Sequence, residues 1–225
     1  MAPRALQLQT IVSQPFEENT YVASLEGSQE CLVIDPGMEP EKILDYLDAQ
    51  GLAPAAILNT HGHADHIAGN ECLKARWPNV PLAIGRGDAE KLTNPDGNLS
   101  AAFGGRLISP TADVLLADGD VYRAAGFELE VALIPGHSKG HVVFIWRGSD
   151  PWLVFGGDVL FSGSIGRTDF PDGDAQQLTE GIHSRLFVLP DDTLVLPGHG
   201  PPTTIGQEQR TNPWVGIPSG YRPQR

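Results

Sequence analysis

Residues 59–69, NTHGHADHIAG, place three histidines and an aspartate within six positions of a chain that has only 7 histidines in all. The apolar run over residues 55–58 predicts a strand that ends here, and Gly62 delays the start of the helix that follows. Alternate residues of an extended segment point to the same side, so the imidazoles of His61 and His63 should face one point. The stretch therefore predicts a strand end that supplies ligands.

Asp65 and His66 extend this cluster into the expected helix. Asp65 lies at the helix start, where a carboxylate is favourable, and His66 falls in the first turn. Imidazole combined with carboxylate suits zinc, iron or manganese, whereas a closed structural zinc site would normally use cysteines. The alternative, loop histidines that only cap and hydrogen-bond, is disfavoured by this density and spacing.

Three further motifs place a ligand-type residue directly after an apolar strand and beside a glycine. IPGH offers His137, VFGGD offers Asp158 and VLPGH offers His199. Strand ends that lead into glycine-bordered loops can deliver ligands to one edge of a sheet without backbone in the way. Together with the first cluster, these residues predict a metal site.

The composition limits the classes of partner. The chain has 225 residues, 40% hydrophobic content and a formal net charge of -13 at pH 7. Binding a polyanion requires clustered Lys and Arg, so we expect no nucleic acid and no membrane as partners. A core of this size needs no metal or disulfide for stability. We expect a single domain over residues 1–225, with a core over about 1–210 and a tail over 211–225.

The cysteines and the N-terminus predict the compartment. Cys31 and Cys72 lie in an apolar run and a helical pattern, which predicts buried free thiols and no disulfide. The first residues, MAPRALQLQTIV, are too polar for the apolar part of a signal peptide, and no window approaches the length of a membrane span. These features predict a cytoplasmic protein.

Apolar runs outnumber helical patterns, which predicts a mixed α/β fold. Strands are expected at residues 6–12, 20–25, 31–34, 55–58, 81–84, 127–134, 142–146, 152–155 and 193–196. Helices are expected at residues 39–50, 65–76, 87–92 and 174–189. The polar stretch 93–111, rich in Gly and Pro, predicts a long loop that could serve as a substrate lid.

The motifs THGHADH, PGH, GGD and PGHG, in that order between residues 60 and 200, resemble those of the metallo-β-lactamase superfamily. The resemblance covers most of the chain. It implies a four-layer αββα sandwich of two mixed β-sheets with helices on the outer faces, and a binuclear site for two divalent metal ions, with zinc expected and iron or manganese as alternatives. The implied ligands are His61, His63 and His137 for one metal, Asp65, His66 and His199 for the other, and Asp158 bridging both.

Within the superfamily, GSIGRTDFPDGD, PGHGPPT and NPW are similar to the short bacterial glyoxalase-II-like hydrolases, which resemble hydroxyacylglutathione hydrolase. This resemblance implies a thioesterase acting on thioesters of the hydroxyacyl-thiol type, such as S-lactoylglutathione. Glyoxalase II itself carries a C-terminal helical domain that helps to hold glutathione, and only 25 residues follow Gly200 here. The thiol therefore stays open.

The mechanism that we expect needs no side-chain nucleophile. Two divalent cations can lower the pKa of a bridging water from 15.7 to about 7, so that hydroxide attacks the acyl carbonyl. Asp65 is expected to steady the hydroxide or move its proton, and Asp158 to keep the metals paired. Asp35 in VIDPG is a candidate partner for the outer nitrogen of a ligand histidine. Asn19 and Tyr21 begin an early strand, and no chemical role is needed to explain them.

Three alternatives fit parts of the sequence. GHSKG matches the G-x-S-x-G nucleophile elbow with Ser138 as nucleophile, but the strand-like HVVFIWR follows where that motif needs a helix. Persulfide dioxygenases also resemble the chain and would hold one iron at His61, His137 and Asp158, although their PAHDY-like context differs from PGHGP here. A structural metal or an RNA-binding module is the third alternative, and the net charge disfavours RNA.

Four further residues have two interpretations each. Arg167 in GRTDF either neutralises an anionic substrate group or is tied to Asp169 in a turn. Lys139 could contact a substrate carboxylate, and a solvated loop lysine is the favoured interpretation. His141 is expected behind the site rather than as a ligand, and His183 at the surface or in packing.

Overall fold

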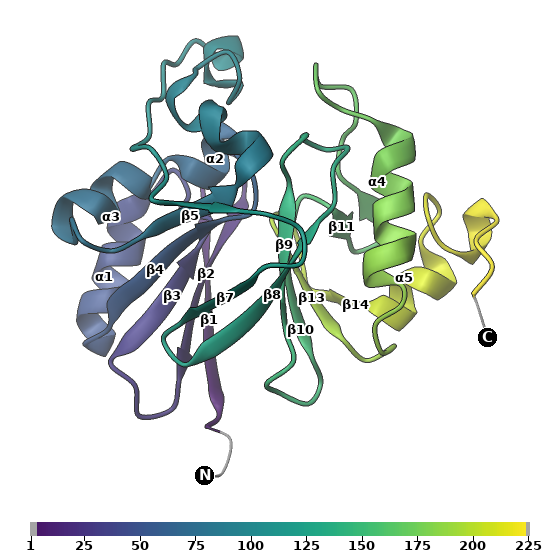
Figure 1. The fold of residues 1–225 in the computed structure, drawn as a ribbon, viewed down its shortest axis with the longest axis horizontal. Helices are drawn as coiled ribbons and strands as arrows, with labels where there is room; N and C mark the ends of the chain where they lie inside the picture. Colours follow the sequence, from purple (N-terminus) through teal and green to yellow (C-terminus); the bar gives the residue numbers. More distant parts are fainter. Residues whose placement is uncertain (1–3, 224–225) are drawn as a thin grey trace.

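The computed structural model of the chain describes residues 4–223, which form a four-layer αββα sandwich (Figure 1). Two six-stranded sheets face each other, and helices cover the outer face of each sheet. The ends of the expected domain, residues 1–3 and 224–225, lie outside the described residues. Within residues 4–223, no helix has the length and apolar character needed to cross a membrane.

The first sheet is mixed and has the strand order β1-β2-β3-β4-β5-β6. Its strands are β1 (Leu6–Ser13), β2 (Glu18–Leu25), β3 (Glu30–Ile34), β4 (Ala53–Asn59), β5 (Leu82–Gly85) and β6 (Val114–Leu116). β1, β2 and β3 pair antiparallel, whereas β3 to β6 run parallel. The carboxyl ends of these parallel strands meet at one edge of the sheet.

The second sheet has the order β14-β13-β10-β9-β8-β7. Its strands are β7 (Val121–Ala124), β8 (Phe127–Leu133), β9 (Val142–Trp146), β10 (Leu153–Gly157), β13 (Leu194–Pro197) and β14 (Thr203–Thr204). Only β10 and β13 pair parallel, and the other neighbours pair antiparallel. A two-stranded ribbon, β11 (Leu160–Phe161) with β12 (Ser164–Ile165), follows β10.

The helices lie on the outside of the sandwich (Figure 1). The α-helices are α1 (Pro40–Gln50), α2 (Ala64–Ile67), α3 (Asn70–Arg76), α4 (Ala175–Gly181) and α5 (Ile205–Thr211). The remaining helical segments are the 3₁₀-helices η1 (Arg86–Thr93), η2 (Ser100–Phe103) and η4 (Ile217–Ser219) and the π-helical turn η3 (Ile182–Leu186). α1 and α3 cover the first sheet, and α4 and α5 cover the second.

The apolar core consists of three clusters, one for each interface between layers. The cluster between the sheets includes Phe127, Phe144 and Phe155. Along β9, Phe144 belongs to this inner cluster, whereas Val143 and Ile145 belong to the cluster under α4 and η3. A strand that is buried on both faces is apolar at every position, which is why such runs were recognisable as strands.

The structure corrects several expected boundaries. The helix expected at 65–76 is two helices, because the chain turns at Gly69, whose N–H donates to the carbonyl of Pro36 at 2.8 Å. The segment expected at 87–92 is 3₁₀, and that expected at 174–189 changes from α to π at Ile182. The short β6, β7, β11, β12 and β14 and the seven-residue α5 were not predicted. Both cysteines are free, but only Cys31 is buried, and Cys72 is partly exposed.

Candidate metal centre

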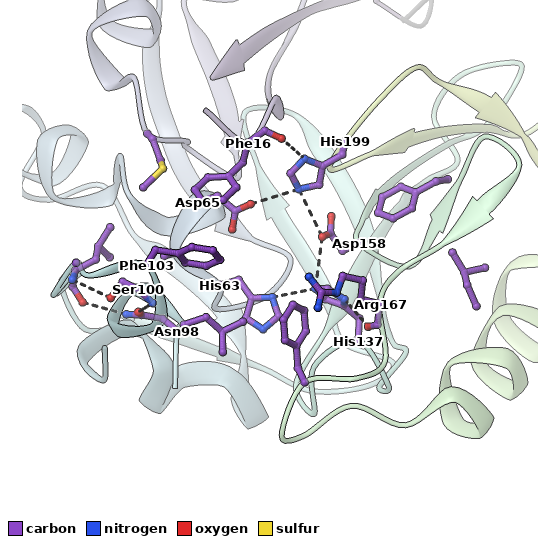
Figure 2. A pocket seen from close by; sticks show the side chains of 18 of the residues that line it. Phe16, His63, Asp65, Asn98, Ser100, Phe103, His137, Asp158, Arg167 and His199 are labelled. Atoms are coloured by element: carbon purple, nitrogen blue, oxygen red, sulfur yellow. Dashed lines mark hydrogen bonds and ion pairs between the residues drawn. The ribbon is translucent and has the colours of Figure 1, made fainter. Parts of the chain in front are cut away.

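The candidate ligands follow strand ends of both sheets and meet at one end of the sandwich. His61 and His63 follow β4 and lead into α2, whereas His137 follows β8 and His199 follows β13. Asp158 comes directly after β10. Figure 2 shows that His63, His137, Asp158 and His199 point toward one another from these separate elements. The structure brings together every residue in the predicted set: His61, His63, Asp65, His66, His137, Asp158 and His199.

Three buried imidazoles form the first group. His63 Nδ1 lies 3.0 Å from His61 Nε2 and 2.9 Å from His137 Nε2. All three side chains belong to buried residues, so the converging nitrogens are shielded from bulk water. This is the geometry that three ligands of one small cation would need.

The second group combines two imidazoles with a carboxylate. Asp65 Oδ2 lies 3.4 Å from His199 Nε2 and 3.9 Å from His66 Nε2. His66 is fully buried, whereas His199 is partly open to the surface. A second cation could therefore lie closer to solvent than the first.

Asp158 lies between the two groups. Its Oδ1 is 3.5 Å from His66 Nε2, and its Oδ2 is 3.5 Å from His137 Nε2 and 3.6 Å from His199 Nε2. One carboxylate thus presents an oxygen to members of both groups. This placement agrees with the bridging role that the resemblance to the metallo-β-lactamase superfamily implies.

Asp35 fixes the orientation of two of these histidines. Its Oδ2 accepts hydrogen bonds from His66 Nδ1 at 3.1 Å and from the Thr60 hydroxyl at 2.7 Å, and its Oδ1 accepts from the Thr60 N–H at 2.7 Å. Thr60 Oγ1 in turn accepts from His61 Nδ1 at 3.1 Å. The predicted partnership of Asp35 with a histidine of the cluster is confirmed.

Backbone carbonyls orient two other histidines of the cluster, His137 and His199. His137 Nδ1 donates to the carbonyl of Arg167 at 2.9 Å, and His199 Nδ1 donates to the carbonyl of Phe16 at 3.0 Å. A ring that donates from Nδ1 keeps a lone pair on Nε2 when it is neutral. The inward nitrogen of each ring is therefore an acceptor when that ring is neutral.

The residues of the cluster are better satisfied with a bound cation than without one. Within the described part of the chain, His66 Nε2 and Asp158 Oδ1 are buried without a hydrogen-bond partner. The lone pairs of the neutral imidazoles and the carboxylate oxygens that converge here repel one another, and burial strengthens the repulsion. A metal ion at their centre removes this cost, so the residues fit the divalent metals that imidazole and carboxylate prefer.

The titration behaviour of the metal-free cluster agrees with this. Burial, reinforced by neighbouring imidazoles, lowers the pKa of His61 and of His63 well below the usual value, and burial also lowers the pKa of His137. For His66, burial works against the charged form, but Asp158 and other carboxylates outweigh it and raise the pKa. The first group is therefore neutral and ready to bind metal at neutral pH.

Asp88 joins the two loops that carry the first group. The fully buried carboxylate accepts from Gly62 N–H at 2.9 Å, from Gly140 N–H at 2.7 Å and from the Ser138 hydroxyl at 2.5 Å. Gly62 lies between His61 and His63, and Ser138 follows His137, so Asp88 sets the distance between the two ligand loops. Sequence reasoning missed this residue.

The loop that carries His199 is held by β2. Asn19 Nδ2 donates to the carbonyls of Pro197 and Gly200 at 3.0 and 2.9 Å, and the Tyr21 hydroxyl donates to the Pro197 carbonyl at 2.7 Å. Both residues were assigned no role from the sequence. Their period-2 spacing on a strand was the available signal, because it directs both side chains to one face.

His141 lies behind the cluster, as predicted. Its ring stacks on His61 with centroids 4.7 Å apart, and its Nε2 accepts from the Asp158 N–H at 3.0 Å. Close approach also explains Gly198, because a Cβ there would lie 2.3 Å from Asp158 Oδ1. These contacts leave little freedom in the position of the Asp158 carboxylate.

The structure decides several of the open alternatives. Ser138 is fully buried and donates to Asp88, and the next regular element is strand β9, so the nucleophile elbow is excluded. Arg167 forms two 2.9 Å hydrogen bonds with Asp169, the structural interpretation. Lys139 pairs with the exposed Glu90, as expected of a solvated loop lysine. His183 stacks against aromatic residues on the far side of the second sheet and is only partly buried, as predicted.

A cavity of about 760 Å³ opens onto the cluster. Its walls are largely apolar and include Phe16, Phe103, Ile165 and Phe170. The 93–111 loop contributes Phe103 and Leu107, so the loop expected near the substrate does line the site. The cavity has the size and character of a pocket for a small organic molecule.

Comparison with known proteins gives the same answer as the geometry. The sequence model of the metallo-beta-lactamase superfamily matches residues 14–199. The chain is 38% identical over 202 residues to the probable metallo-hydrolase YqgX of Bacillus subtilis, covering 89% of this chain and 93% of that protein. It is 34% identical over 217 residues to the hydroxyacylglutathione hydrolase GloC of Haemophilus influenzae, covering 93% and 98%.

Two solved structures share the whole fold. The B3 metallo-beta-lactamase BLEG-1 superposes with a TM-score of 0.88 at 34% identity, covering 93% of this chain and 99% of that one. TTHA1623, solved in a di-iron-bound form, superposes with a TM-score of 0.79 at 38% identity, covering 92% and 100%. The predicted fold class is confirmed, and the chain belongs to the metallo-beta-lactamase superfamily of metallo-hydrolases.

Proposed function

We propose that the protein is a binuclear metallohydrolase that cleaves thioesters of the hydroxyacyl-thiol type. The observation that carries the proposal is the placement of Asp158 between two groups of ligand-type side chains, beside an apolar cavity. The similarity to a hydroxyacylglutathione hydrolase supports the thioester. The proposed partner is a small acyl substrate rather than a nucleic acid or a membrane, consistent with the net charge of -13.

The two groups are the proposed ligand sets. His61, His63 and His137 would hold one metal, and Asp65, His66 and His199 the other, with Asp158 shared. Zinc is the proposed metal, and the di-iron form of TTHA1623 supports iron as its rival. When bound, the metals would supply the Lewis acidity that lowers the pKa of water to about 7 and polarises an acyl carbonyl.

The chain's own residues supply the rest of the chemistry. Asp65 remains charged because His66 and His199 lower its pKa against the opposing effect of burial. Its carboxylate faces the cavity and can accept a proton from the attacking water and return it to the leaving thiolate. Asp158 is held by the His141 contact to its backbone, which keeps its carboxylate between the two groups. The apolar walls exclude water from the acyl chain.

The test measures metal content and hydrolysis on the same sample. We expect about two metal ions per chain and cleavage of S-lactoylglutathione that a chelator abolishes and added metal restores. His63→Ala should abolish turnover, and His183→Ala, which removes a histidine on the far side of the second sheet, should keep it. Active protein that contains no metal, or full turnover in His63→Ala, would refute the proposal.

Two rival activities can be tested on the same preparation of the protein. The likeness to BLEG-1 favours β-lactam hydrolysis as a second candidate, and a chromogenic cephalosporin assayed beside the thioester decides between them. A dioxygenase with one iron at His61, His137 and Asp158 would contain one metal per chain and would consume oxygen when a persulfide is added. The convergence of further ligand-type residues at the site supports the binuclear hydrolase instead.

A further inference from the structure

Arg106 brings an unpaired positive charge to the cavity. It is exposed, lines the cavity and has no ion pair or side-chain hydrogen bond within residues 4–223. Arg167, the other arginine that lines the cavity, is occupied by Asp169 and stacks on Phe170 at 4.6 Å. Its guanidinium is therefore available to an anionic ligand of this cavity.

The backbone on both sides of Arg106 is fixed. Gly105 N–H donates to the Ser100 carbonyl at 2.9 Å, and Leu107 N–H donates to the Ser100 hydroxyl at 3.0 Å. The side chain of Asn98 donates to the Leu107 carbonyl at 3.0 Å. Asn98 and Ser100 are buried and lie next to each other in the same loop (Figure 2). Arg106 therefore projects from an anchored segment, and little backbone entropy is lost when it binds.

The same loop is tied directly to the metal centre. The Asn98 carbonyl accepts from Ala64 N–H at 2.9 Å, and Ala64 lies between His63 and Asp65. Asn98 thus connects the segment of Arg106 to the ligand loop. This contact fixes the backbone of the Arg106 segment relative to the ligand loop.

Apolar side chains line the same cavity as Arg106 and the ligand cluster. Phe103 packs edge-on against Phe16 with ring centroids 5.2 Å apart and an interplanar angle of 66°. Both rings and Leu99 line the cavity, and Phe103 is 68% exposed. A substrate that occupies the cavity can therefore meet the ligand cluster, apolar walls and the guanidinium of Arg106.

We propose that Arg106 is a specificity residue that binds a carboxylate of the substrate remote from the reacting carbonyl. This inference rests on the proposed function, because it assigns the anionic group to the thiol part of a cleaved thioester. A guanidinium matches a carboxylate with two parallel N–H···O hydrogen bonds, which gives both charge and direction. The substrate class is therefore an acyl thioester of an anionic thiol, with an apolar segment between the two ends.

Direct binding tests the inference without turnover. The probes are S-hexylglutathione, which carries carboxylates and an apolar chain, and its dimethyl ester, which lacks those charges. Titration calorimetry on the metal-loaded protein should show that Arg106→Gln weakens S-hexylglutathione about tenfold and the ester less than about twofold. Arg106→Lys should recover part of the loss, and higher salt should weaken only the charged probe.

Arg86→Gln is the matched control. Arg86 is also exposed and has no ion pair within the described residues, but it does not line the cavity, and its loss changes the net charge by the same amount. We expect its affinities to equal those of the wild type. Unchanged binding in Arg106→Gln, or an equal loss in Arg86→Gln, would overturn the inference.

Hydrolysis of S-lactoylglutathione, measured on the same proteins, separates the two proposals. Binding that depends on Arg106 in a protein without thioesterase activity keeps the anion site and overturns the proposed function. Thioester cleavage by a protein whose binding does not depend on Arg106 keeps the proposed function and overturns the anion site. With both proposals correct, Arg106→Gln raises KM for the charged thioester and leaves kcat nearly unchanged.

Discussion

Replacing Asp35 by asparagine tests whether the outer partner of His66 controls metal binding. The change keeps the volume of the side chain and replaces one carboxylate oxygen by an NH2 group. The remaining oxygen can still accept from the Thr60 N–H, but the NH2 group then faces His66 Nδ1, where an acceptor now lies at 3.1 Å. Two donors cannot share this contact, so the proton of His66 moves to Nε2, the nitrogen that faces the cluster.

The magnitude follows from these contacts. Removing the outer partner of a ligand histidine typically lowers metal affinity by about 10- to 100-fold, which is about 1.4 to 2.7 kcal/mol. The metal-free fold should also lose stability, because Asp35 Oδ2 accepts two buried hydrogen bonds. Hydrogen bonds to a charged group contribute about 1.5 to 3 kcal/mol each, and asparagine restores part of this. We therefore expect a loss of about 2 kcal/mol in the free energy of unfolding.

The assay has two parts. Metal affinity is measured by dialysis against buffered free metal followed by elemental analysis, and stability is measured by urea denaturation in chelator. Asp113→Asn is the control, since Asp113 also accepts a backbone N–H, that of Leu82 at 2.9 Å, and pairs with Lys74, but its side chain is 47% exposed and it is not one of the candidate ligands. The control should lose a little stability and no metal affinity. Metal affinity within twofold of the wild type in Asp35→Asn would refute the reasoning.

Three further outcomes follow from contacts of buried groups. Asp88→Asn should lower metal affinity and destabilise the fold by about 2 kcal/mol, because the Gly62 N–H loses its acceptor; unchanged metal content and urea midpoint would contradict this. Burial raises the pKa of Glu18 well above 4.5, so the native state holds a proton that the unfolded state releases, and wild-type stability falls as pH rises above that value. Glu18→Gln removes this loss, and the gap between the urea denaturation free energies of the two chelated proteins should widen from about pH 4 to pH 7; a constant gap would count against it. Burial raises the pKa of Cys31 to about 12, so a thiol reagent at pH 8 should label the partly exposed Cys72 in the native protein and Cys31 only after unfolding, as mass spectrometry can check.

The ligand cluster was predictable from the sequence because each member stands in a local pattern. His61 and His63 share a strand end, and the other motifs repeat one arrangement of apolar run, glycine and ligand. Asp35 was found for the same reason, since it follows β3 toward the same edge. Local patterns and the alternation of side chains along strands are sufficient to predict this cluster, because the strand ends of the two sheets converge there.

Residues that act across the fold gave no such signal. Asp88 lies in a short 3₁₀-helix, and its partners are 26 to 52 residues away in the sequence. The sequence also does not distinguish Arg167 from Arg106. Both are arginines in polar loops, and only the three-dimensional contacts reveal that Asp169 neutralises the first while the second is left free. The break at Gly69 also depends on a contact with Pro36 that the helical pattern does not contain.

Because the candidate ligands come from strand ends of both sheets, the centre exists only when the two sheets are stacked. A metal ion therefore binds the native state, in which the ligands lie together, and not the unfolded chain, in which they are far apart. By mass action, free metal at 1,000 times its dissociation constant would add about 4.1 kcal/mol to the stability of the native state. The stability of this protein would accordingly rise and fall with the supply of its metal.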